Sequence, residues 1–288
     1  MTQIPEIQLG KLNTLRIVKE VDFGFYLEGA IRGHREEILL PRGEASSPLP
    51  KVDEEVTVFL YLDQEERLVA SMRTPLAQVG DFSFLETSWV NNYGAFLNWG
   101  MLKDLFVPFR EQKQKMQKGQ KYIVHVHLDE ETYRIVASAK IERYFSHEFP
   151  PYQVGDEVNI LIWQKTDLGL KAIVDNRFPG LLYDNQMFRH LQTGDCTKAF
   201  ISQVRPDGKI DLSLQRAGHA SVLDFSEILL QHLQTNGGFT PLGDKSPAEE
   251  IYAMFGVSKK VFKKAVGDLY KHRLIEITED GIHLIHKP

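Results

Sequence analysis

Short runs of alternating apolar and polar residues fill the first three quarters of the chain, and Gly, Pro, Asp or Asn interrupts them every few residues. Alternation with a period of two is typical of half-buried β-strands, and the interrupting residues are typical of turns between strands. The runs recur in the same order over residues 8–73, 79–143 and 153–216. Each repeat of about 65 residues accommodates five short strands, which predicts three small closed barrels.

Acidic clusters mark the turn expected between the last two strands of each repeat. They lie at residues 63–66 and 129–131 in the first two repeats, and Asp207-Gly208 takes their place in the third. Such residues are typical of β-hairpin turns. The predicted barrels, of the OB-fold type, span residues 1–76, 77–147 and 148–217.

Residues 218–288 follow a different pattern, in which apolar residues recur at a helical period. Ser246, followed by Pro247, is typical of a helix start, and this second helix is expected to end at Gly256. Ser258 is expected to cap a third helix. Three helices followed by a hairpin predict a winged helix-turn-helix. The helices are expected over residues 222–233, 247–255 and 259–273, and the strands over 275–278 and 282–285.

The repeats also share a short phrase on their second expected strand. Residues 22–26 read Asp-Phe-Gly-Phe-Tyr, and residues 92–96 read Asn-Tyr-Gly-Ala-Phe. With the closing hairpin, these residues resemble S1-type RNA-binding domains. Three such repeats followed by a winged helix are similar to the conserved virulence factor B (CvfB) family of bacterial RNA-binding proteins. The expected fold class is therefore mainly β, with three tandem OB-type barrels and a C-terminal α/β winged-helix module.

The resemblance implies binding of RNA, preferably single-stranded, on the faces of the barrels. Bases would stack on exposed rings while Lys or Arg at the edges meets phosphate. The family's platform combines two rings three residues apart, one residue of the third strand, and an Asp and an Arg of the closing hairpin. Carried over to this sequence, the candidate RNA-binding residues are Phe23, Tyr26, Arg67, Tyr93, Phe96, Lys103, Arg134 and Tyr183.

The three copies fit this platform to different degrees. Leu40 and Val107 stand at the third-strand position of the first two repeats, and Tyr183 stands there in the third. In the third repeat Leu168 and Lys171 replace the two rings. We therefore expect RNA contact to be strongest in the second repeat, weaker in the first and weakest in the third.

Four lysines of the third helix share one helical face, opposite its apolar side, because they are spaced four apart in two pairs. In winged-helix proteins this helix enters a groove of nucleic acid. A lysine face is also typical of a solvated surface helix, so both interpretations stay open. The candidate nucleic-acid contacts on this helix are Lys259, Lys260, Lys263 and Lys264.

Four other side chains have simpler expected roles. His125 and His127 lie two residues apart on an expected strand and face the same side, but no third ligand follows at a suitable spacing, so no metal site is expected. Phe25 is expected in a barrel core. Cys196 lies within a strand pattern and is expected to be a buried small hydrophobic residue.

The composition narrows the classes of function. The 34 Lys and Arg against 39 Asp and Glu give a net charge of −5, which is not typical of a generic nucleic-acid binder or of a polybasic membrane-surface protein. The single cysteine excludes an intramolecular disulfide and a Cys-based zinc cluster. Neither a signal peptide nor an apolar run long enough to cross a membrane is evident. We expect a cytoplasmic protein with no membrane partner, and a monomer is favoured.

The charge is distributed unevenly among the expected modules. Residues 1–76 hold 9 Lys and Arg against 13 Asp and Glu, whereas residues 77–147 hold 9 against 8. The repeat with the best ring pair is therefore the least acidic. This distribution predicts RNA binding with weak electrostatics, in which stacking on a few rings supplies much of the affinity.

The sequence contains none of the common enzyme motifs, such as a phosphate-binding loop, a His-Glu-x-x-His zinc motif, a nucleophile elbow or a dinucleotide fingerprint. We expect a protein that is not an enzyme and has no cofactor; the resemblance implies a role in post-transcriptional regulation of gene expression. Two alternatives stay open. One is a DNA-binding regulator that uses the winged helix, and the other is a scaffold for protein interactions.

Overall fold

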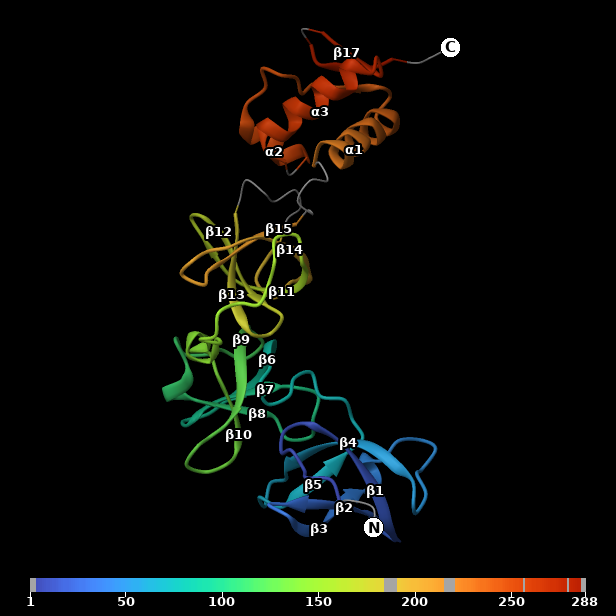
Figure 1. Ribbon diagram of the computed structural model, residues 1–288, viewed down its shortest axis with the longest axis vertical. Helices are drawn as coiled ribbons and strands as arrows, with labels where there is room; N and C mark the ends of the chain where they lie inside the picture. The colour runs from blue at the N-terminus through green and yellow to red at the C-terminus, as the bar shows by residue number, and fades with distance from the viewer. Residues whose placement is uncertain (1–3, 184–190, 215–220, 256, 279, 286–288) are drawn as a thin grey trace. The chain divides into compact units, whose positions relative to one another are not determined.

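The computed structural model describes residues 4–183, 191–214, 221–255, 257–278 and 280–285. It contains three closed five-stranded barrels and a C-terminal module of three α-helices with a small sheet (Figure 1). The chain divides into two compact units, residues 1–145 and 146–288. The predicted fold class is confirmed.

The first barrel has the cyclic strand order that all three barrels share. Its elements are β1 (Leu12–Val21), β2 (Gly24–Ile31), β3 (His34–Pro41), the 3-10 turn η1 (Arg42–Glu44), β4 (Glu55–Leu62) and β5 (Leu68–Ser71). The strands close in the order β1-β2-β3-β5-β4, and every pair is antiparallel except β3 with β5. Closure leaves no long unpaired edge, which suits a small barrel.

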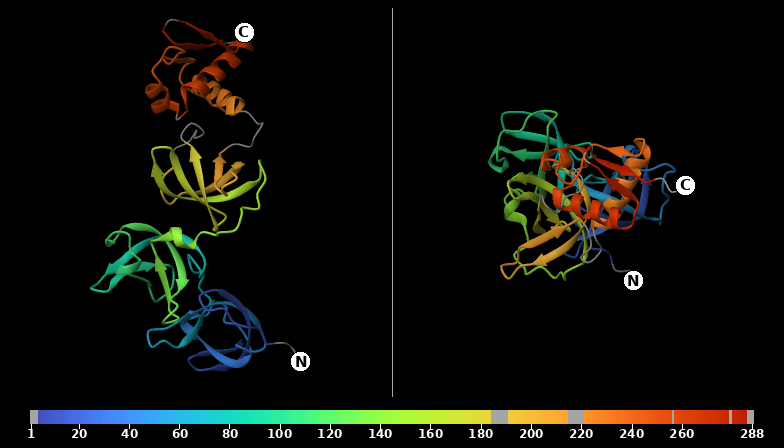
Figure 2. Two further views of the ribbon diagram at one scale, coloured as in Figure 1. Left: turned by 60° about the vertical axis from the view of Figure 1, so that its left-hand side comes forward. Right: turned by 90° about the horizontal axis from the view of Figure 1, so that it is seen from above.

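The second and third barrels repeat this order, including the one parallel pair. Figure 2 draws the second barrel in green and the third in yellow to orange. The second consists of β6 (Phe82–Val90), β7 (Gly94–Asn98), β8 (Leu105–Pro108), η2 (Phe109–Glu111), β9 (Lys121–Leu128) and β10 (Ile135–Ser138), followed by η3 (Ile141–Tyr144). The third consists of β11 (Glu157–Thr166), β12 (Gly169–Val174), β13 (Phe178–Tyr183), β14 (Cys196–Val204) and β15 (Ile210–Ser213).

Alternate residues of each strand point into the barrel and form its core. On β2 the inward residues are Phe25 and Leu27, which are fully buried, so the prediction for Phe25 is confirmed. Cys196 corrects another prediction: it is exposed rather than buried. It is the first residue of β14, and the buried positions of that strand begin only at Ala199.

In each barrel one glycine allows the second strand to lie close to the third; in the first barrel a Cβ on Gly24 would overlap the Leu40 carbonyl oxygen. A Cβ on Gly94 would overlap the Val107 carbonyl oxygen and lie 2.8 Å from the Phe106 ring. A Cβ on Gly169 would overlap the Leu182 carbonyl oxygen in the same way. Only glycine permits this approach, so the Gly of the shared phrase is a packing requirement of the barrel.

The first and second barrels share a hydrophobic cluster. Phe59 and Tyr61, on the outer face of β4, are buried together with Trp99 of the second barrel, and the Phe59 and Trp99 rings meet edge to face at 5.3 Å. The main chain also joins the barrels, because the Val79 amide donates to the Gly10 carbonyl oxygen at 2.8 Å. The two barrels of the first unit are therefore packed against each other.

The C-terminal module is the predicted winged helix with one strand more than expected. The Ser258 hydroxyl accepts the Val261 amide at 3.4 Å, as a cap should. Gly256, expected to end the second helix, lies outside the described residues. No helix in the described ranges is both long and apolar enough to cross a membrane. The elements are α1 (Ser221–Thr235), β16 (Phe239–Thr240), α2 (Ala248–Phe255), α3 (Lys259–Lys271), β17 (Ile275–Ile277) and β18 (Ile282–Leu284), with the sheet order β16-β18-β17.

Candidate nucleic-acid interface

The residue before the strand-packing glycine is exposed in all three barrels. It is Tyr93 in the second barrel, Phe23 in the first and Leu168 in the third, with exposed fractions of 76%, 60% and 65%. The Tyr93 amide donates to the Asn91 side-chain oxygen at 2.8 Å, which fixes the turn that carries the ring. The turn thus presents an apolar side chain to solvent in each barrel, and in two of the three it is aromatic.

A row of three rings crosses the outer face of the second barrel. Phe96 on β7 pairs in register with Trp89 on β6 and with Phe106 on β8. The Trp89 and Phe96 rings stack at 3.7 Å with an interplanar angle of 2°, and Phe96 meets Phe106 at 4.9 Å. The Trp89 indole N–H donates to the Asp104 carboxylate at 3.0 Å. This row places an ordered aromatic surface beside Tyr93.

Trp89 and Phe106 were not among the residues predicted from the sequence. A β-bulge between Thr87 and Trp89 shifts the register of β6. Without the bulge, Trp89 would point inward like Leu85 and Thr87, which are buried. Comparison of the repeats could have revealed this, because the same position holds Lys19 in the first repeat and a glutamine in the third.

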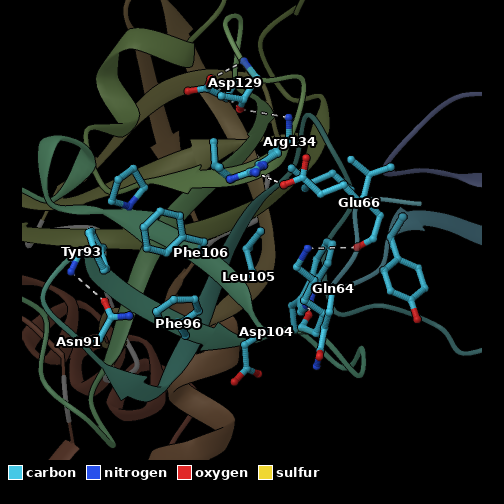
Figure 3. A pocket seen from close by; sticks show the side chains of 18 of the residues that line it. Gln64, Glu66, Asn91, Tyr93, Phe96, Asp104, Leu105, Phe106, Asp129 and Arg134 are labelled. Atoms are coloured by element: carbon cyan, nitrogen blue, oxygen red, sulfur yellow. Dashed lines mark hydrogen bonds and ion pairs between the residues drawn. The ribbon is translucent and has the colours of Figure 1, made fainter. Parts of the chain in front are cut away.

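The ring row lines a cleft of about 910 Å³ between the first and second barrels. Figure 3 shows Tyr93, Phe96 and Phe106 on one side of this cleft and Gln64 and Glu66 of the first barrel on the other. A volume of this size is typical of ligand-binding clefts, and the lining combines the rings with charged and polar side chains of both barrels.

The Asp and the Arg that the resemblance implies for the closing hairpin pair with each other only in the first barrel. There Arg67 pairs with Asp63 at 2.7 Å. In the second barrel, Arg134 instead pairs with Glu66 of the first barrel. Asp129, the aspartate of the same hairpin, is bound by Arg110.

Asp129 has its own set of hydrogen-bond donors in the hairpin. The amide and hydroxyl of Thr132 both donate to its carboxylate at 2.9 Å. These bonds, backbone first, lower the pKa of Asp129, and the Arg110 charge adds to the effect. Because these groups already bind the Asp129 carboxylate, the Arg134 side chain pairs instead with Glu66 of the first barrel.

Lys103 is also used within the protein. Its ammonium donates to the carbonyl oxygens of Asp63 at 2.8 Å and of Leu62 at 3.3 Å. Burial lowers the pKa of Lys103, and the charge of Asp63 opposes that shift. The lysine therefore ties the second barrel to the hairpin of the first, and any phosphate would have to compete with these carbonyl groups.

The first barrel has a smaller aromatic surface. Phe23 and Tyr26 meet edge to face at 6.4 Å, and the Lys19 ammonium lies 5.8 Å from the centre of the Tyr26 ring. On the third strand, Leu39 is the residue paired with Tyr26. The first barrel therefore has two rings and a cation where the second barrel has its row of three rings.

The third barrel carries charged groups at the equivalent positions. Lys171 stands where Phe96 stands in the second barrel and lies 5.0 Å from the centre of the Trp163 ring. Arg205 follows β14, where an aspartate follows β4 and β9, and it pairs with Asp211 at 2.9 Å. The Tyr183 hydroxyl accepts a hydrogen bond from Arg205.

The register corrects the prediction for the third-strand position. Leu40 and Val107 are fully buried, so they belong to the barrel cores rather than to a binding face. Tyr183 is not their equivalent, because it pairs with Gly169 just as Pro41 pairs with the first barrel's glycine. The outward residues of the third strand beside the ring position are Leu39, Phe106 and Leu181.

The lysine face of α3 lies opposite the buried Phe262 and Leu269, as predicted. Lys260, Lys263 and Lys264 are exposed, and Lys259 is half-buried. Lys263 pairs with Asp244 at 3.0 Å. Within the described ranges, Lys259, Lys260 and Lys264 form no ion pair.

His125 and His127 do face the same side of β9, where Tyr144 of η3 covers them. The His125 and Tyr144 rings stack at 4.1 Å, and the Tyr144 hydroxyl lies 3.1 Å from a His127 ring nitrogen. Burial, and then the neighbouring His127, lowers the pKa of His125 to about 4. No group of three or more His, Cys, Asp or Glu side chains in the described part of the chain could hold a metal ion.

Comparison with protein families matches two parts of the chain. Residues 227–284 match the CvfB-like winged helix domain, and residues 9–73 match the S1 domain. The resemblance to the conserved virulence factor B family is confirmed.

Two curated relatives match most of the chain. "Uncharacterized protein YitL" of Bacillus subtilis is 27% identical over 273 residues, covering 91% of this chain and 89% of that protein. "Conserved virulence factor B" of Staphylococcus aureus is 22% identical over 244 residues, covering 82% of this chain and 81% of that protein. Among solved structures, a multidomain protein with nucleic acid binding domains from Streptococcus pneumoniae matches with 22% identity and a TM-score of 0.43, covering 96% of this chain and 98% of that one.

Proposed function

Because the chain joins an S1 domain to a CvfB-like winged helix domain, we propose that it binds single-stranded RNA, chiefly on the outer face of the second barrel. The observation that carries this proposal is the row of rings beside the exposed Tyr93. Every nucleobase has a face that can stack on such rings, which gives affinity without a demand for one sequence. The other candidate contacts, on the first barrel and at Tyr183, are secondary in this proposal.

The charges around the cleft support binding that depends more on stacking than on salt. Arg134 and Arg110 are paired with carboxylates, and Lys103 is held by carbonyl oxygens. A phosphate would have to displace these partners, so few new ion pairs would form on binding. For single strands each such pair contributes a slope of about −0.7 to the dependence of affinity on salt, so a shallow slope is expected.

The proposal also covers the mode of action and the biological role of the chain. We propose that the chain acts by binding rather than by catalysis, in post-transcriptional regulation of gene expression. Its relative in S. aureus bears the name of a virulence factor, and the matched families here are an S1 domain and a winged helix. RNA held by stacking can be sequestered or presented to other proteins without a chemical step.

The test is the binding of homopolymeric RNA and DNA oligonucleotides to the full chain at low salt. The double variant Tyr93→Ala, Phe96→Ala should bind RNA at least tenfold more weakly, since one lost stack is worth about 1–3 kcal/mol. The matched control is Leu168→Ala, Lys171→Ala, at the equivalent positions of the third barrel, which should bind almost as the parent does. Equal affinity of the first variant and the parent protein would remove the second barrel from the proposal.

A second candidate function is DNA binding through the winged helix. It is favoured by the exposed Lys260 and Lys264, which form no ion pair in the described ranges and lie on the helix that enters a groove in this fold. A duplex footprint that Lys260→Ala, Lys264→Ala abolishes, and that the Tyr93, Phe96 double variant leaves intact, would establish this function instead.

A further inference from the structure

We infer that the outer face of Trp89 is the surface on which the second barrel stacks a nucleobase, and that Phe96 is a positioning residue behind it. This inference rests on the proposed function, which it makes more specific. It changes which ring of the row touches the ligand.

Phe96 has no face left for a base. Its register partners Trp89 and Phe106 lie on the two flanking strands, so they cover it from opposite sides. On one side the parallel stack with Trp89 at 3.7 Å leaves no space for a third ring. On the other side Phe106, at 4.9 Å, leans over the ring at an angle of 35°. A base could reach Phe96 only if one of these neighbours moved.

Trp89 keeps one face open. Its exposed fraction is 44% although Phe96 covers one side of the indole. The pairing of β6 with β9 runs only from Phe82 to Glu86, so no strand residue is paired on the far side of Trp89. Trp89 also helps to line the cleft between the first and second barrels.

The indole is also held in place before any ligand arrives. Its N–H donates to Asp104 at 3.0 Å, and its other face rests on Phe96. A ring fixed by a hydrogen bond and a stack loses little conformational freedom when a base binds to it. Asp104 and Phe96 therefore position Trp89 rather than contact the base themselves.

This surface distinguishes the second barrel from the other two. The register position of Trp89 holds Lys19 in the first barrel and Gln164 in the third. All three side chains follow the same β-bulge, so the scaffold presents the position equally in each barrel. Only the second barrel puts a ring there.

The experiment measures the affinity of the full chain for oligoadenylate and for oligouridylate. Each oligonucleotide has about twelve nucleotides, a length within the span of an OB-type barrel. Binding is followed by titration of tryptophan fluorescence and by a filter assay that does not depend on fluorescence. In the parent protein, stacking on Trp89 should quench the emission. Trp89→Ala should bind about tenfold more weakly. Trp89→Phe, which keeps a ring, should bind about threefold more weakly and lose the quenching. Trp163→Phe, the matched control in the third barrel, should keep both the affinity and the quenching.

The outcomes separate this inference from the proposed function. If the parent protein binds neither oligonucleotide, the proposed function fails. If RNA binds and Trp89→Ala binds as tightly as the parent, or if Trp89→Phe retains the quenching, the assignment to Trp89 is overturned while RNA binding stands. Thermal unfolding of each variant shows whether the barrel is intact, and Trp89→Lys, which copies the first barrel, provides a second ring-free variant with a side chain native to this position.

Discussion

The second barrel places Trp89, Phe96 and Phe106 on its outer face at register positions where the third barrel places a glutamine, a lysine and a leucine. The hairpins of the two barrels also differ in charge, because Arg205 follows β14 in the third barrel where Asp129 follows β9 in the second. One surface is a row of three rings, and the other combines a polar, a charged and an apolar side chain. Yet both barrels have the same strand order, the same parallel pair and the same bulge.

The difference shows which residues the barrel itself requires. The inward residues and the strand-packing glycines satisfy close packing, so they are restricted to a few residue types. The outward residues that lie outside the contact between the first two barrels do not pack in a core, so close packing leaves them free to vary. Conserved architecture therefore does not imply a shared ligand, and the two surfaces must be tested separately.

The largest effect is expected where the two barrels are most alike. Gly94→Ala and Gly169→Ala should each destabilise their own barrel by at least about 3 kcal/mol, the upper end for overpacking, because the added Cβ overlaps a carbonyl oxygen of the third strand. Hydrogen exchange resolved by peptides should show the loss of protection in the mutated barrel. Gly43→Ala, where a Cβ meets no atom within 4 Å, is the control. Unchanged protection in both barrels would show that the packing requirement is misassigned.

A smaller effect should depend on pH and appear only in the second barrel. His125 lies at the register position that Phe200 occupies in the third barrel. The pKa of His125 is lowered by burial to about 4, so between pH 6.5 and 4 the unfolded chain binds a proton that the folded chain does not. The free energy of unfolding should therefore fall as the pH drops through this window, by about 3 kcal/mol in total.

His125→Phe, which copies the third barrel, should remove most of this pH dependence. The measurement is the urea midpoint of the first unit's unfolding at pH 7 and at pH 5, followed by hydrogen exchange or by tryptophan emission. His127 is half-buried beside Tyr144, and burial lowers its pKa as well. Some dependence of stability on pH should therefore remain in the variant. A variant as sensitive to pH as the parent would assign the effect to another group.

The ring surface should be transferable because the scaffold presents both positions in each barrel. The double substitution Gln164→Trp, Lys171→Phe gives the third barrel the stacked pair of the second. One additional stack of about 1 kcal/mol should raise RNA affinity roughly fivefold. The control is Gln164→Trp alone, whose indole would lack the supporting ring. No gain in the double variant would mean that the ring pair is insufficient without the cleft beside it.

The sequence predicted the repeats, the closed barrels and the winged helix because the residues that pack in a core recur at the period of a strand or a helix. It did not predict Trp89, since alternation from Leu85 and Thr87 places residue 89 inside the barrel, and only the bulge turns it outward. Nor could it predict that Arg134 leaves its own hairpin for Glu66, because that contact depends on how two barrels pack. Local patterns thus predicted the modules, whereas the site depends on a register shift and on a contact between modules.

The smallest expected effect concerns the ion pair that Arg134, in the hairpin of the second barrel, forms with the first barrel. In the third barrel, the hairpin residue Lys209 pairs instead within its own turn, with Asp207 at 2.7 Å. Glu66→Gln should cost only about 0.5 kcal/mol of stability, because both partners are half exposed and surface pairs are weak. It should also free Arg134 to meet a phosphate. The salt dependence of RNA binding should then steepen by about 0.7, as expected for one added phosphate contact.

The matched control for this ion pair is Glu65→Gln, which removes the same charge from the same hairpin. Glu65 pairs at 2.8 Å with Arg67, which Asp63 also holds, so Arg67 keeps a partner when Glu65 is neutralised. If both variants steepen the slope equally, the change reports net charge alone, and Arg134 has no special place at the cleft. If only Glu66→Gln does so, the carboxylate of the first barrel occupies a phosphate position on the second, and the two barrels bind RNA as one surface.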